Sequence, residues 1–158
     1  MAKEEGLEAK KTPPTIFWDS EETLAFRPGR WRAALTEVLD EHEPGHKVDA
    51  EQFRPYLRDA FPWHKPDQPH HHLSTAKAWW SHMETILARA YQGVGFDNPR
   101  AKELARLAHK HFVDPKGFLL FDDAIPALEF LGNRGWQHVI LSNHTPELPE
   151  IVKGLGLS

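Results

Sequence analysis

The segment from residue 15 to residue 24 constrains the fold more than any other part of this sequence. Its first four residues, Thr-Ile-Phe-Trp, are apolar and favour β-structure, and the polar residues Asp-Ser-Glu-Glu follow at once. This pattern is typical of a buried parallel strand whose carboxyl end opens into a polar loop. Open α/β sheets place their functional sites at the carboxyl ends of the strands. The segment therefore predicts an α/β protein with Asp19 and Glu21 at a candidate site.

A second segment of the same kind lies near residue 140. An apolar run from Trp136 to Leu141 leads into Ser142 and Asn143, and His144 is a further candidate to line the same site. A hydroxyl and an amide between a strand end and a helix N-terminus suit phosphate binding. Taken one at a time, both segments have a plainer interpretation. Ser142 then only caps the next helix, and residues 19–22 form a capped turn with solvated glutamates.

Between the two segments the hydrophobic period is helical. Apolar residues at helical spacing predict helices near residues 31–39, 74–94 and 98–112, and Asp49 with Gln52 resembles a capping box that opens a further helix. A helix near residues 123–131, the strand at 136–141 and a helix starting at Thr145-Pro146 complete the chain. A strand, a helix and a second strand in this order imply a right-handed parallel crossover.

Composition narrows the class of protein. The chain has 158 residues, a formal net charge of −4 and no cysteine. These values argue against a general nucleic-acid binder and exclude disulfides. No apolar run reaches the roughly 20 residues that span a bilayer, so no membrane partner is expected. The first 13 residues are charged and lack a signal-peptide core, which predicts a disordered tail and a cytoplasmic protein.

Together the two polar segments resemble the haloacid-dehalogenase-like superfamily. Asp19, Thr23 and Leu24 match its first motif, Asp-x-Asp-Gly-Thr-Leu, and Ser142 with Asn143 matches its second. The resemblance implies a partial Rossmann-like three-layer core with an inserted α-helical cap. The implied core comprises residues 14–27 and 116–158, the cap comprises residues 28–115, and the chain ends after the second motif.

The resemblance also implies a chemistry. Asp19 would be the nucleophile and a Mg²⁺ ligand, and Glu21 would be the general acid/base and a second contact to the metal. Thr23, Ser142 and Asn143 would bind the phosphate. The expected activity is a phosphatase that hydrolyses a small phosphorylated metabolite through an aspartyl-phosphate on Asp19.

Two departures from the first motif predict an impaired or inactive enzyme. Glu21 replaces the family's aspartate and is one methylene longer, and Glu22 replaces its glycine. The alternatives are a non-catalytic remnant or interaction module, and a dehalogenase-type hydrolase that attacks carbon without a metal. A small sheet with an open edge further predicts self-association.

Overall fold

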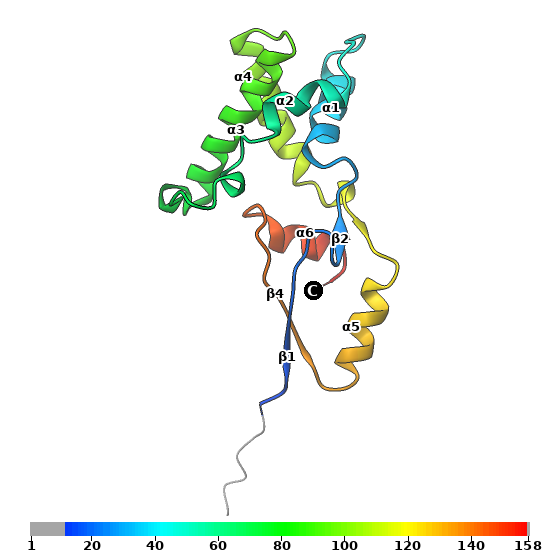
Figure 1. Ribbon diagram of the computed structural model, residues 1–158. Coiled ribbons are helices and arrows are strands. Elements are labelled where there is room, and N and C mark those ends of the chain that lie inside the picture. The colour runs from blue at the N-terminus through cyan, green and yellow to red at the C-terminus, as the bar shows by residue number, and fades with distance from the viewer. Residues whose placement is uncertain (1–11, 158) are drawn as a thin grey trace, which may run out of the picture.

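The computed structural model describes residues 12–157, so the predicted N-terminal tail lies almost entirely outside the described residues. A helical unit lies above a small α/β core (Figure 1). The helical unit contains α1 (Arg30–His42), α2 (Arg54–Leu57), α3 (Ala76–Gly93), α4 (Asn98–Phe112) and the short 3-10 turns η1 (Ala50–Phe53), η2 (Pro62–His64) and η3 (His71–Leu73). The core contains β1 (Thr15–Trp18), β2 (Ala25–Phe26), η4 (Pro115–Gly117), β3 (Leu119–Leu120), α5 (Ala124–Gly132), β4 (Gln137–Ile140) and α6 (Leu148–Gly154).

The strands form two separate pairs. β1 and β4 pair in parallel, with Phe17 opposite Val139 and Trp18 opposite Ile140. This pairing confirms the predicted parallel crossover and the predicted α/β class. β2 and β3 form a two-residue antiparallel pair that the sequence does not predict, because two residues are too few to show a periodicity.

The main hydrophobic core lies in the helical unit. Most residues of the predicted apolar faces of α1, α3 and α4 are buried against one another, including Leu35, Leu39, Met83, Leu87, Leu104 and Ala108. Trp79, Val94 and Leu107 of these faces are partly buried. Tyr91 is also fully buried, and its hydroxyl donates a hydrogen bond to the carbonyl of Leu35 at 3.0 Å. Burial of each large apolar side chain stabilises the fold by about 1.5–3 kcal/mol, so these helices hold together largely through their own packing.

Local sequence signals set most of the helix ends. The predicted capping box is confirmed, because the Asp49 carboxylate accepts from the backbone of Gln52 and the Gln52 side chain accepts from Asp49 N–H. It opens the turn η1 ahead of α2. α6 begins at Leu148, later than the predicted start at Thr145. Pro149 occupies the first turn of α6, where its missing N–H costs no hydrogen bond, so the helix begins just before it.

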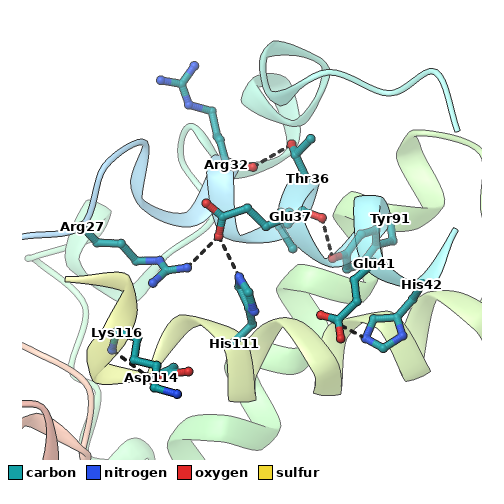
Figure 2. A network of polar contacts seen from close by, with 11 residues as sticks. Arg27, Arg32, Thr36, Glu37, Glu41, His42, Tyr91, His111, Asp114 and Lys116 are labelled. Atoms are coloured by element: carbon teal, nitrogen blue, oxygen red, sulfur yellow. Dashed lines mark hydrogen bonds and ion pairs between the residues drawn. The ribbon is translucent and has the colours of Figure 1, made fainter. Parts of the chain in front are cut away.

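Two connections join the helical unit to the core, residues 27–29 and residues 113–118. The Arg27 guanidinium is buried between them and donates to the Glu37 carboxylate at 2.8 Å (Figure 2). It also lies over the ring of Phe112. Glu37 also contacts His111 Nε2 at 2.7 Å. The predicted domain boundaries, 27/28 and 115/116, fall in these connections, and the division into domains stays a prediction.

One face of the parallel pair is open. Phe17 is 63% exposed, Val139 41% and Leu141 72%. Side chains alternate between the faces of a strand, so the paired residues Phe17 and Val139 present a common apolar face. Among residues 12–157, no helix combines the length and apolarity that a membrane crossing requires.

Candidate active site

Asp19 and Ser142, which are far apart in the sequence, meet at the carboxyl end of the parallel pair. Leu141 N–H donates to the carbonyl of Trp18 at 2.9 Å, which sets the two strand ends side by side. Ser142 Oγ then donates to Asp19 Oδ1 at 2.5 Å, and Ser20 N–H donates to the same oxygen at 2.8 Å. The parallel register is the cause of this contact, because it brings both strand ends to one edge of the sheet.

The loop after Asp19 is a tight turn. The buried Ser20 offers its carbonyl to the N–H groups of Leu24 and Ala25, at 3.0 and 3.1 Å. Glu22 N–H donates in turn to the carbonyl of Ala25, and Glu22 has a φ of 61°. This left-handed conformation favours glycine. Glu22, which stands where the first motif has glycine, is therefore at a position where the backbone disfavours a side chain.

The Glu21 carboxylate lies between two basic groups. His144 Nε2 is 3.7 Å from Glu21 Oε2, and Arg30 Nε is 3.7 Å from Glu21 Oε1. Arg30 also bonds Glu22 at 2.7 Å, and this bond raises the pKa of the guanidinium above its ordinary value. Both carboxylate oxygens of Glu21 therefore face basic groups, at distances longer than a hydrogen bond.

A cleft of about 890 Å³ opens beside this loop, between the core and the helical unit. Glu21, Asn143 and His144 line it from the core side, and Trp63 lines it from the helical side. Asp19 and Ser142 are not among the lining residues. Asp19 is exposed and Ser142 half-buried, and each lies one or two residues before a residue that lines the cleft, Glu21 and Asn143 respectively.

The candidate residues are thus only partly assembled. Asp19 and Ser142 are in contact, and Glu21 and Asn143 share the cleft. Thr23 is exposed and outside the lining, so its role in phosphate binding stays a prediction.

Sequence reasoning missed the basic wall of the cleft. Five arginines line the cavity, namely Arg27, Arg30, Arg32, Arg54 and Arg58. The only advance signal was the spacing of Arg54 and Arg58, which places them on one face of a helix. Scattered arginines on a chain of net negative charge do not otherwise indicate a site.

The described residues do not fit a complete magnesium site. Among residues 12–157, no three His, Cys, Asp or Glu side chains come together as a metal group. The second expected ligand, Glu21, has its two carboxylate oxygens directed at Arg30 and His144. Mg²⁺ binds through carboxylates that face it, usually beside substrate phosphates and water. The magnesium expectation stays a prediction, and the chemistry below uses no metal step.

Comparison with known proteins supports the fold. No protein-family model and no curated protein matches the chain. The crystal structure of a 2-haloacid dehalogenase from Pseudomonas syringae pv. Tomato DC3000 is similar, with a TM-score of 0.54. The chain has a haloacid-dehalogenase-like fold. The match covers 93% of this chain and 60% of the dehalogenase, at 22% identity, so this chain spans less than two thirds of that protein. At this identity the likeness concerns the fold alone.

Proposed function

We propose that this chain carries the nucleophile of a hydrolase that cleaves a small phosphorylated metabolite through Asp19. The observation that supports the proposal best is the contact between Asp19 and Ser142, whose positions differ by 123 residues in the sequence. A carboxylate nucleophile beside a hydroxyl donor, at the carboxyl end of parallel strands, is an arrangement suited to phosphoryl transfer.

In the proposed reaction, Asp19 Oδ2 attacks phosphorus while the bond from phosphorus to the alcohol oxygen breaks. The departing oxygen takes a proton from the Glu21 carboxyl, and Ser142 turns its hydroxyl from Asp19 to a phosphoryl oxygen. Water then attacks the phosphorus of the aspartyl-phosphate and gives a proton to Glu21. This second step releases phosphate and restores the Asp19 carboxylate.

The proposed activity is low. Glu22 brings a second negative charge to the loop that would face an anionic substrate, and Arg30 neutralises it only in part because both side chains are exposed. The extra methylene of Glu21 moves its carboxyl from where the family's shorter aspartate would place it, and a shift of about 1 Å can cost ~100-fold in rate.

Phosphate release from an aryl phosphate tests this proposal. We expect slow turnover by the full chain, assayed both with and without Mg²⁺, and a loss on the order of 10³-fold in Asp19→Asn. Asp59→Asn removes the same charge from an exposed turn of the helical unit and should keep full activity. Turnover that survives Asp19→Asn would contradict the nucleophile. No turnover under either condition would favour the non-catalytic alternative.

A dehalogenase-type reaction is the second candidate, and the position of Glu21 favours it. In that reaction Asp19 displaces halide from carbon and needs neither a leaving-group acid nor a metal, which agrees with a Glu21 held between Arg30 and His144. The structural similarity to a 2-haloacid dehalogenase adds support. Chloride release from a 2-chloro acid, absent in Asp19→Asn and faster than phosphate release, would select this candidate.

A further inference from the structure

The cleft is basic although the chain is acidic. Its five lining arginines face two lining glutamates, Glu21 and Glu22, while the whole chain has a formal net charge of −4. Two of the arginines, Arg32 and Arg54, share one carboxylate, that of Glu51. Arg58 has no ion pair with any acid in residues 12–157. Positive charge is therefore concentrated in this cleft, where low-dielectric walls strengthen its attraction for anions.

The same wall presents an aromatic surface. Trp63 is 40% exposed and lines the cleft, and its other neighbours hold it in place. Phe61 stacks on it at a centroid distance of 4.5 Å and 14° between planes, and Trp79 lies 6.1 Å away at 28°. Phe61 is buried and Trp79 partly buried, so Trp63 packs on a fixed aromatic cluster while 40% of its own surface stays exposed. A flat, preorganised ring favours a flat partner.

We propose that this cleft binds an anion attached to a planar aromatic group, with the ring against Trp63 and the charge near Arg54 and Arg58. Guanidinium groups bind phosphate and carboxylate through paired N–H donors, and both arginines come from the short segment that also carries Trp63. Asp19 and Ser142 do not line this cleft, so the proposed site is a binding site beside the proposed nucleophile and goes beyond the proposed hydrolysis. Binding of an anion to the cleft can be measured whether or not the chain is a hydrolase.

Binding affinity for five probes tests the proposal. Phenyl phosphate and cyclohexyl phosphate match in charge and approximate size but differ in planarity, phenol has the ring without the charge, and inorganic phosphate has the charge alone. We expect calorimetric titration of the full chain to give phenyl phosphate an affinity about fivefold above cyclohexyl phosphate. Benzoate should bind as well, and its affinity relative to phenyl phosphate distinguishes carboxylate from phosphate as the preferred anion.

Matched variants test separately how much the Trp63 ring and the Arg58 charge contribute to binding. Trp63→Leu keeps an apolar side chain but removes the flat surface, so the preference for the phenyl ring should vanish. Trp136→Leu changes a tryptophan of similar exposure, 38%, outside the cleft and should leave the preference intact. Arg58→Ala should weaken both organic phosphates about tenfold. Arg134→Ala removes an equal charge outside the cleft, where Arg134 lies over Phe130, and should change little.

Equal affinity for the phenyl and cyclohexyl phosphates, or an unchanged preference in Trp63→Leu, would overturn the proposal. So would an equal loss in Arg58→Ala and Arg134→Ala, since binding would then reflect overall charge. The two proposals fail separately. Ring-selective binding without any turnover refutes the hydrolase and leaves the binding site, whereas turnover without ring selectivity refutes the binding site alone.

Discussion

At the scale of single residues, the loop that follows β1 holds most of the charged groups of the candidate site. Glu22 has a left-handed backbone and an exposed side chain that bonds Arg30, while Glu21 turns its carboxylate toward Arg30 and His144. One arginine therefore holds two neighbouring glutamates. The price of this arrangement is a strained backbone at position 22, because an L-residue with a side chain is disfavoured at a φ of 61°.

Replacing Glu22 with glycine should relieve this strain. We expect Glu22→Gly to raise the free energy of unfolding by about 1 kcal/mol, as measured by urea denaturation. Glu22→Ala removes the same carboxylate and the same exposed ion pair but keeps a Cβ, so it should show no such gain. If the two variants are equally stable, the backbone at position 22 is not under strain.

The same substitution should also change the binding of anions. Because glycine removes a negative charge beside the proposed phosphate site, Glu22→Gly and Glu22→Ala should both bind anionic probes more tightly than the natural chain. Only the stability of the two variants should differ.

At the scale of elements, the connection between the helical unit and the core depends on one buried arginine. Burial lowers the pKa of Arg27, and the neighbouring Glu37 carboxylate opposes this by favouring the charged form. The guanidinium also lies over the rings of Phe112 and Phe118, near the two ends of the connection formed by residues 113–118. Its Nε and Nη1 atoms are buried and make no hydrogen bond within residues 12–157. A buried charge with a single strong partner is sensitive to any change that displaces it.

Gly117 leaves the space that this guanidinium fills. A Cβ at position 117 would lie 1.4 Å from Arg27 Nη1, so Gly117→Ala must displace the guanidinium and break its bond to Glu37. We expect a loss of about 2–3 kcal/mol in the free energy of unfolding, measured by thermal and urea denaturation. Gly132→Ala is the control, because its Cβ would meet only His138 Nε2 at an ordinary 3.5 Å.

Gly132 ends α5, so alanine there should cost nothing and help the helix slightly. Equal stability of the Gly117 and Gly132 variants would show that the buried arginine does not hold the two connections together.

At the scale of the whole molecule, burial is uneven. The helices have a continuous hydrophobic core, whereas the parallel pair exposes an apolar face at Phe17 and Val139. Contiguous apolar surface on a sheet, together with unpaired strand edges, favours association between chains. The self-association predicted from the sequence therefore has a specific surface, and it stays a proposal.

Substitutions on that face should reduce association. We expect the full chain to form concentration-dependent oligomers in sedimentation experiments, and Phe17→Thr with Val139→Thr to shift it toward monomer. Threonine keeps a high strand propensity while it removes apolar surface. Trp63→Thr removes an exposed aromatic residue from the helical unit and should not change the oligomeric state. A natural chain that stays monomeric at every concentration would contradict the proposal.

The sequence by itself determined the class of the fold and placed Asp19 and Ser142 directly after two predicted strands. The apolar run 15–18 that precedes Asp19, and the run 136–141 that precedes Ser142, carry enough local information to predict two parallel strands. The helical periods and the capping box at Asp49 are equally local, because they depend on spacing within one element. The late start of α6 was missed, since two prolines compete for the first turn of that helix.

Only the tertiary structure decided what surrounds that pair. Arg30, Arg58 and Trp63 come from separate turns of the helical unit, and no local pattern marks them as residues of one cleft. The pairing of Glu21 with His144 likewise depends on two loops that meet only when β1 and β4 pair. Strand and helix propensities act over a few residues, whereas the charge and shape of a cleft are set by chain segments that long-range packing brings together.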